Sequence, residues 1–318
     1  MDLRTKTEAE WTAFATRCLK PDPQRLGTWT ARNWGRPVAL RITRVVAPCG
    51  CSANLATMSA CVVAFFACVA FCIGGLWGLT AGCLLLHVWY LLDHVDGQLA
   101  RLRGTASLDG TALDYLMHHG VQLFLPQAVC FGLFRSTEAT AWLLAGAAWG
   151  GGALLLGLRH DVRYKAFIQR LKLLHGELRL VGGGGGRPVP AELPRRKWGH
   201  VFRWCIIKCY ETHIVMMTLS LVALAAWFAE GLLTPALSAY VSLMALPAPG
   251  IALFHVARAI EREEAEREFA AWFRVPDGST LELRNGWWYV VPVDDAYQPT
   301  PRTKEGVPAP SASCDGLS

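Results

Sequence analysis

Charged residues are scarce in this chain of 318 residues: Asp, Glu, Lys and Arg make up only 18%, whereas hydrophobic residues make up 53%. Soluble globular domains usually carry about 25% charged residues. The scarcity excludes an intrinsically disordered chain and an ordinary water-soluble enzyme. Long uncharged blocks alternate with short arginine-rich ones, and this is the pattern of a polytopic membrane protein.

Metal-binding cysteine pairs and a basic nucleic-acid-binding face are also missing. The chain has 11 Cys, most of them inside apolar blocks, where they behave as small hydrophobic residues. Cys49 and Cys51 form one close pair, but the sequence has no second cysteine pair at the spacing that a zinc site requires. No basic run is interleaved with aromatic residues, so the net charge of +6 does not indicate nucleic-acid binding. The first residues contain no apolar segment, so we expect no cleaved signal peptide.

Six apolar segments are long enough to cross a membrane, since a transmembrane helix needs about 20 predominantly apolar residues. They are residues 53–75, 77–98, 110–133, 139–158, 204–229 and 234–257. Lys and Arg gather on one side of these segments, in residues 1–50, 101–103 and 159–203. Cytoplasmic loops carry the excess of Lys and Arg. We therefore expect an all-α integral membrane protein with six transmembrane helices and both termini in the cytoplasm.

The expected organisation has three parts, with the six-span domain in the middle. Short cytoplasmic and interfacial helices precede it, beginning with an amphipathic helix, and a small soluble tail follows it. The Gly/Pro-rich loop within the domain is expected to be flexible, and the tail to hold a helix extension, a short hairpin at Asn285-Gly286 and a disordered end. The boundaries are 1–50, 51–258 with the loop at about 180–198, and 259–318.

One cluster of ionisable residues lies where the second predicted span ends and the third begins. One helix face carries residues at i, i+3, i+4, i+7 and i+8: Asp93, Asp96, Gly97, Ala100 and Arg101. The next helix carries residues at i, i+4 and i+8: Gly110, Asp114 and His118. A short connection makes the two helices antiparallel neighbours, so the carboxylates and the histidine converge. A salt bridge to Arg101 would explain one interfacial aspartate, whereas the whole set suits a divalent cation such as Mg²⁺, Mn²⁺ or Ca²⁺.

This spacing resembles the signature of the CDP-alcohol phosphatidyltransferase family. The pattern reads Asp-x2-Asp-Gly-x2-Ala-Arg-x8-Gly-x3-Asp-x3-His, and only its last position departs from the family, which has a fourth Asp there. The shorter motif Asn54-x2-Thr57 also matches. The resemblance implies a six-span fold that transfers a substituted phosphate from a CDP-alcohol to a hydroxyl acceptor and releases CMP in phospholipid biosynthesis. Lipid substrates and a homodimer are implied as partners.

The resemblance also implies roles for individual residues. Mg²⁺ or Mn²⁺ would be held by Asp93, Asp96, Asp114 and His118. The CDP site would be formed by Asn54, Thr57, Asp93, Gly97, Ala100, Arg101 and Gly110. The family's fourth Asp is proposed to deprotonate the acceptor hydroxyl, so His118 is the candidate catalytic base.

Several alternatives stay open from the sequence. In one alternative, His118 is the base. In another, the second metal that the family's fourth Asp contacts is lost or changed, and another residue serves as the base. In a third, the protein binds a CDP-alcohol without turnover as a sensor or scaffold. The donor is expected to be CDP-diacylglycerol, with a soluble CDP-alcohol such as CDP-choline as the alternative. The composition, rich in Ala, Gly and Arg, favours a bacterial cytoplasmic membrane. Acceptor binding is assigned to Arg159, Arg163, Lys165, Glu211 and His213, although lipid headgroups and interhelical hydrogen bonds would explain these residues equally well.

Overall fold

The computed structural model describes residues 3–19, 28–180 and 205–293, and most of them are helical. They form two compact units. One comprises the described residues up to 165 together with 205–265, and the other comprises 166–180 and 266–293. All but the first residue of the predicted flexible loop at 180–198, and the predicted disordered end beyond residue 293, lie outside the described residues.

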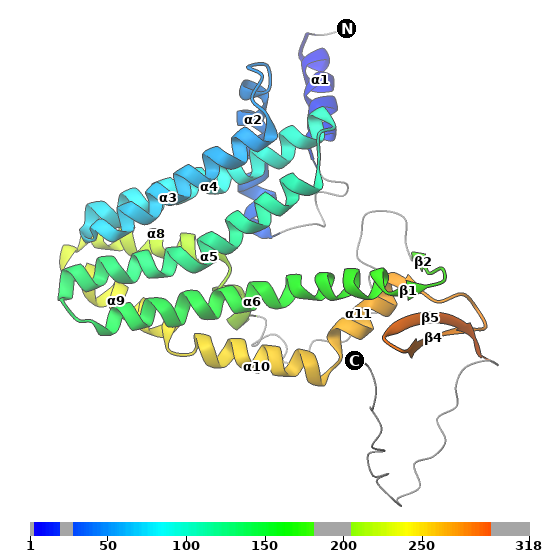
Figure 1. Ribbon diagram of the computed structural model, residues 1–318. Helices are drawn as coiled ribbons and strands as arrows, with labels where there is room; N and C mark the ends of the chain where they lie inside the picture. Colours follow the sequence, from blue (N-terminus) through cyan, green and yellow to red (C-terminus); the bar gives the residue numbers. More distant parts are fainter. Residues whose placement is uncertain (1–2, 20–27, 181–204, 294–318) are drawn as a thin grey trace, which may run out of the picture. The chain divides into compact units, whose positions relative to one another are not determined.

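Three long helices position the site in the first unit: α3 (Ala53–Ile73), α4 (Gly75–Arg103) and α5 (Leu108–Thr137). Helix α3 packs along both α4 and α5 (Figure 1). Helix α4 ends at Gly104, whose φ of 66° is left-handed, a conformation that glycine adopts without strain. Ser107 then caps α5, because its hydroxyl accepts a hydrogen bond from the Gly110 backbone N–H at 3.0 Å. The short turn brings the end of α4 beside the start of α5.

The remaining helices lie before and after these three in the chain, and two of them, α6 (Ala141–Lys172) and α11 (Glu264–Trp272), have residues in both units. The π-helical segment Ala31–Gly35 runs directly into α2, and α9 is separated from α10 at Pro247, a residue that has no backbone N–H to continue a helix. Helix α1 lies within the N-terminal part, residues 1–50, where an amphipathic helix is predicted. The bounds are α1 (Leu3–Cys18), α2 (Arg36–Val46), α6 (Ala141–Lys172), α8 (Thr212–Phe228), η2 (Glu230–Leu232), α9 (Leu233–Ala245), α10 (Ala248–Glu261) and α11 (Glu264–Trp272).

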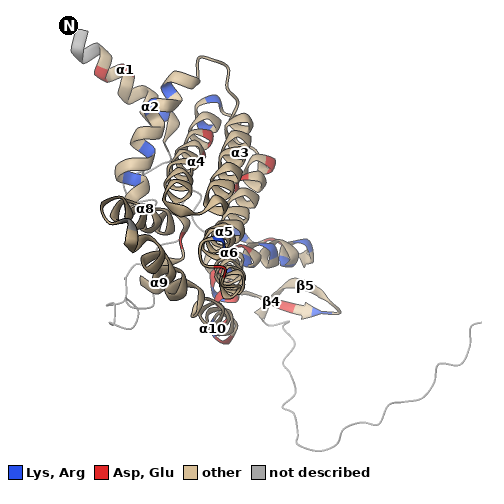
Figure 2. Ribbon diagram, turned by 90° about the vertical axis from the view of Figure 1, so that its left-hand side faces the viewer, with Lys and Arg blue, Asp and Glu red and all other residues tan. Residues whose placement is uncertain are grey.

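Four helical stretches of the described chain are long and apolar enough to cross a membrane: α3, α4, α6 and Leu233–Glu261, which joins α9 and α10. Figure 2 shows long stretches of these helices without Lys, Arg, Asp or Glu. They identify an integral membrane protein of the all-α class. Helix α8 is apolar but has 17 residues, and α5 has 30 residues but is less apolar. The count of six spans therefore stays a prediction.

Small residues allow the helices of the first unit to approach closely. A Cβ atom added at Gly132 of α5 would lie 2.2 Å from the carbonyl oxygen of Phe71 on α3. The buried core of this unit draws on four helices, with Ala60 from α3, Trp89 from α4, Val129 from α5 and Met216 from α8. The contact between Gly132 and Phe71 fixes α3 against α5 at the end opposite to the polar cluster, which lies at the start of both helices.

The second unit is a small mixed structure at the end of α6. Strands β4 (Ser279–Arg284) and β5 (Trp287–Pro292) form an antiparallel hairpin whose turn is Asn285–Gly286, both with positive φ. The guanidinium of Arg170 lies 4.2 Å from the ring centroid of Trp288 and also pairs with Glu266. The short strands are β1 (Leu174–His175), parallel to β5, and β2 (Arg179–Leu180), antiparallel to β3 (Phe273–Arg274).

Candidate metal and nucleotide site

A polar cavity of about 450 Å³ lies between the ends of α3, α4 and α5. Its lining contains every residue that the sequence assigns to metal or CDP. These are Asn54, Thr57, Asp93, Asp96, Gly97, Ala100, Arg101, Gly110, Asp114 and His118. The structure thus brings together in one cavity residues that come from three helices and are up to 64 positions apart in the chain.

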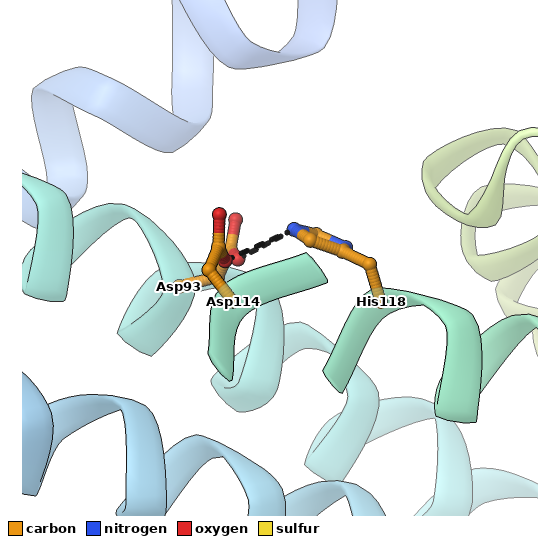
Figure 3. Close-up of side chains that lie close together, drawn as sticks. All are labelled: Asp93, Asp114 and His118. Atoms are coloured by element: carbon orange, nitrogen blue, oxygen red, sulfur yellow. Dashed lines mark ion pairs between the residues drawn. The ribbon is translucent and has the colours of Figure 1, made fainter. Parts of the chain in front are cut away.

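Three side chains in this cavity converge closely enough to hold one cation: Asp93 from α4, with Asp114 and His118 from α5 (Figure 3). His118 Nε2 lies 2.9 Å from Asp93 Oδ1 and 3.4 Å from Asp114 Oδ1. Ligands held at about 2.1 Å in octahedral geometry lie about 3 Å from their neighbours. The spacing and the oxygen-rich donor set therefore fit a divalent cation.

Asp96 lies in the same cavity but outside this group of three. It is buried, with 7% of its surface exposed, and the Thr57 hydroxyl donates a hydrogen bond to its Oδ2 at 2.7 Å. This contact joins the motif on α3 to the motif on α4. Asp96 can contribute to a cation through its second oxygen, and its role as a ligand stays a prediction.

The part of the cavity that is predicted to bind CDP contains small residues. A Cβ atom added at Gly97 would lie 3.2 Å from Nη1 of Arg101, so the guanidinium lies directly over the bare helix backbone. A Cβ atom at Gly110 would lie 3.5 Å from Oδ1 of Asn54. The absence of a side chain at Gly97 leaves room for the Arg101 guanidinium, which offers N–H donors of the kind that bind phosphate oxygens.

His94 is a site residue that the sequence interpretation missed. Its Nδ1 lies 3.2 Å from Asp93 Oδ2, so the two histidines His94 and His118 contact opposite oxygens of one carboxylate. A Cβ atom at Gly35 would lie 2.8 Å from the His94 ring, which also packs on Tyr90. The adjacency of His94 to Asp93 was a visible signal, but the contact needs the ring position that Gly35 and Tyr90 set. Arg36 and Tyr115 also line the cavity and were not predicted.

The predicted acceptor residues do not line this cavity within the described part of the chain. Arg159 and Arg163 lie 2.9 and 3.9 Å from Glu264 Oε2, in ion pairs at the start of α11. Lys165 is exposed on α6.

The other two acceptor candidates form a separate polar group at the start of α8. Glu211 pairs with Lys208, and His213 Nε2 lies 3.5 Å from Glu211 Oε2. All five predicted acceptor residues therefore stay a prediction.

His119 takes part in a different contact from its neighbour His118. Its Nε2 lies 2.8 Å from Asp161 Oδ2 on α6, and its Nδ1 lies 3.2 Å from Gln122 Oε1. This polar contact links α5 to α6. His118 alone of the two lines the cavity in the described structure.

Comparison of the sequence with protein-family models shows which family this part of the chain resembles. Residues 51–170 match the family model named CDP-alcohol phosphatidyltransferase, so this part of the chain is a CDP-alcohol phosphatidyltransferase domain. The match confirms the resemblance seen in the sequence, and it contains α3, α4 and α5. The family consists of phosphotransferases for substituted phosphate groups that act in phospholipid biosynthesis and use divalent metal. Among curated proteins, none matches the chain.

Proposed function

We propose that this protein is a membrane CDP-alcohol phosphotransferase that transfers a substituted phosphate from CDP-diacylglycerol to a hydroxyl acceptor and releases CMP. The observation that carries the proposal is the single cavity lined by all the predicted metal and CDP residues. The proposed location is a bacterial cytoplasmic membrane with this cavity facing the cytoplasm, and the proposed assembly is a homodimer.

The proposed cation is Mg²⁺ or Mn²⁺, held by the carboxylates of Asp93, Asp96 and Asp114. Such an ion, when bound, neutralises charge on the pyrophosphate and makes CMP a better leaving group. The protein side of the site supplies further cationic and polar contacts. Arg101 binds phosphate oxygens, while Gly97 and Gly110 let the diphosphate approach the helices.

His118 is the proposed base that accepts the proton of the acceptor hydroxyl. Asp93 and Asp114 both contact Nε2, which leaves Nδ1 to accept the proton when Nε2 carries a hydrogen. The acceptor oxygen then forms a bond to the phosphorus of the substituted phosphate as the bond to the CMP oxygen breaks. The two carboxylates stabilise the imidazolium that results. If Nε2 instead binds the metal, Nδ1 carries the hydrogen and His118 cannot be the base.

The acceptor is proposed to bind near the arginines at the end of the apolar part of α6. Arg159 and Arg163 share Glu264 as a partner, so an acceptor phosphate would have to compete with that carboxylate. Lys165, Glu211 and His213 complete the proposed acceptor set. Acceptors that carry an anionic group would suit this set best.

A lipid donor is supported by a second cavity, an apolar groove of about 840 Å³ between α3 and α5. It is lined by Leu113, Leu116 and Met117, which alternate along α5 with Asp114 and His118 of the polar cavity. On α3, Cys61 of the groove follows Thr57 of the polar cavity by one turn. The groove therefore begins where the polar cavity ends, as the acyl chains of CDP-diacylglycerol require, whereas CDP-choline has no chain to place there.

If the groove holds the acyl chains, the effect of a substitution in it on the donor KM should depend on acyl-chain length. Val69 lines it about 18 Å along α3 from Thr57, at 1.5 Å per residue. Val69→Trp should displace about two methylenes of a long chain and raise the KM for the dipalmitoyl donor roughly tenfold, at about 0.8 kcal/mol per methylene. The KM for the dihexanoyl donor should not change, because its chains do not reach Val69.

Val62→Trp is the matched control, since Val62 is also an exposed valine of α3 but does not line the groove. Equal KM changes for the two donors in Val69→Trp, or the same change in both variants, would argue against the groove as the chain site.

The function itself is tested by CMP release from the purified protein in lipid. CDP-diacylglycerol and CDP-choline are offered in turn with Mg²⁺ or Mn²⁺ and a mixture of hydroxyl acceptors, and Asp96→Asn is the control. We expect release from CDP-diacylglycerol alone, and its loss in Asp96→Asn by two to three orders of magnitude.

A catalytically inactive sensor or scaffold is the second candidate function. It is favoured by one observation, the contact of His118 with both carboxylates, which can hold the site together without a metal. Metal-dependent CDP binding without CMP release from any CDP-alcohol would establish this alternative.

A further inference from the structure

We infer that helix α1, which precedes the matched family domain, completes the donor site by holding Arg101 in place over the cavity. The inference rests on the proposed function for its link to catalysis, because Arg101 is the proposed phosphate ligand. The contact between α1 and Arg101 stands independently of that function. It makes the N-terminal helix a positioning element of the site.

The contact is a reciprocal exchange of arginine caps between the ends of two helices. Nε of Arg101, near the end of α4, donates a hydrogen bond to the Cys18 carbonyl at the end of α1 at 2.6 Å. Nη2 of Arg17, near the end of α1, donates to the Leu102 carbonyl at the end of α4 at 3.1 Å. The last carbonyls of a helix have no partner within it and carry partial negative charge. Each helix therefore supplies an arginine that hydrogen-bonds to a carbonyl at the end of the other helix.

Two further observations fix α1 in this position. Cys18 is fully buried, with 0% of its surface exposed, although it is the last residue of its helix. The guanidinium of Arg44 on α2 lies 5.4 Å from the ring centroid of Trp11, in a cation–π contact. Helix α1 is thus held at its end by α4 and along its length by α2.

The N–H groups of the Arg101 guanidinium face two different places. Nε faces Cys18, whereas Nη1 and Nη2 lie over Gly97 in the cavity. Without α1, the long side chain would be free to leave the cavity, and donor binding would have to restore its position. Binding of the donor and docking of α1 must then favour each other by the same factor, because such coupling is reciprocal.

Cys18 gives a direct readout of this docking, since its buried thiol can be alkylated only when α1 moves away. We would measure the alkylation rate of Cys18 by N-ethylmaleimide in the full-length protein in lipid, resolved by mass spectrometry. Cys49, an exposed thiol of the same chain, is the internal control. Arg101→Ala should raise the Cys18 rate at least severalfold with no ligand present, and CDP with Mn²⁺ should lower it in the wild type but not in Arg101→Ala.

Kinetics test the link from α1 to the donor site. Arg17→Ala removes one cap without touching the cavity, so the donor KM should rise roughly threefold to tenfold, the range for one net hydrogen bond, with kcat unchanged. Arg41→Ala, which removes an exposed arginine of α2, should change neither. Rescue by Arg17→Lys would confirm that the cap, and not the packing of the helix, carries the effect.

The possible results separate this inference from the proposed function. An unchanged Cys18 rate in Arg101→Ala would overturn the docking contact even if the wild type releases CMP. An unchanged donor KM in Arg17→Ala, or a loss confined to kcat, would overturn the positioning role. Absence of CMP release from the wild type, with Cys18 still protected by CDP, would instead refute the proposed transferase and leave α1 as part of a nucleotide-binding site.

Discussion

At the scale of single residues, His118 stands at the position where the resemblance predicts a fourth Asp. The imidazole contacts two carboxylates through one nitrogen, Nε2. A carboxylate in its place would add negative charge and a hard oxygen ligand, which suits Mg²⁺ better than nitrogen does. We therefore expect the identity of residue 118 to affect both the proposed proton transfer and the preference for one divalent cation over another.

His118 variants should separate these roles. We expect His118→Ala to lower kcat by about two to four orders of magnitude, the range for a lost general base, and His118→Asp to retain far more activity. Steady-state kinetics measure this difference. A fully active His118→Ala protein would exclude His118 as the base.

Electron paramagnetic resonance of bound Mn²⁺ supplies a readout independent of turnover. If His118 is the base and the ion is held by carboxylates, the spectrum should show no nitrogen coupling from His118, and His118→Asp should leave it unchanged. A nitrogen coupling that disappears in His118→Asp would show that Nε2 is a metal ligand instead.

At the scale of helices, close approach through glycine fixes α3 against α5. At Gly132, an added methyl group would meet the backbone oxygen of Phe71 at 2.2 Å, and a backbone oxygen cannot turn aside. Gly132→Ala should therefore lower the free energy of unfolding by about 1–3 kcal/mol, the usual cost of overpacking. Denaturation in detergent micelles would measure the change.

Gly120→Ala on the same helix is the matched control, because an added Cβ atom meets nothing within 4 Å there. Alanine has the higher helix propensity, so this variant should be neutral or slightly more stable. Equal destabilisation by the two variants would contradict the packing account.

The second unit contains an ion pair that joins the end of α6 to α11. Arg170 pairs with Glu266 and holds the pKa of Glu266 below its ordinary value of 4.5. A lowered pKa in the folded state adds stability above pH 4.5, and this contribution is lost as the pH falls through the folded pKa. Because Glu266 is exposed, the contribution should be below about 1 kcal/mol.

Fluorescence of the tryptophans in the second unit would follow its acid unfolding, since Arg170 covers the Trp288 ring. We expect Glu266→Gln to reduce the loss of stability below pH 4.5. Glu282→Gln, which removes the carboxylate paired with Arg284 in the β4–β5 hairpin, serves as the comparison. The same acid response in wild type and Glu266→Gln would show that another group is responsible.

At the scale of the whole molecule, the asymmetric placement of Lys and Arg predicts that both chain ends face the cytoplasm. Reporter fusions measure this: in a bacterial host, green fluorescent protein at either end should fluoresce, and alkaline phosphatase at either end should be inactive. Active phosphatase at one end only would require an odd number of spans and overturn the six-span topology.

The sequence by itself determined the helical membrane class and predicted residues that the structure places in the lining of one cavity. Residues at i, i+3, i+4, i+7 and i+8 share a helix face wherever that helix lies, so the motifs on α4 and α5 could be placed in one cavity from spacing alone. The Asn54–Thr57 motif joined them through its resemblance to the family. Helical periodicity is local, and a sequence encodes it directly.

The tertiary structure decided the contacts between elements far apart in the chain. It directs Asp96 to Thr57, sets His118 between Asp93 and Asp114, pairs Arg159 with Glu264 and places the end of α1 on Arg101. Spacing did not predict these pairings, because each depends on which helices pack together and on how closely glycines such as Gly35 and Gly132 let them approach. Local periodicity selects the face of a helix, and only packing selects its partner.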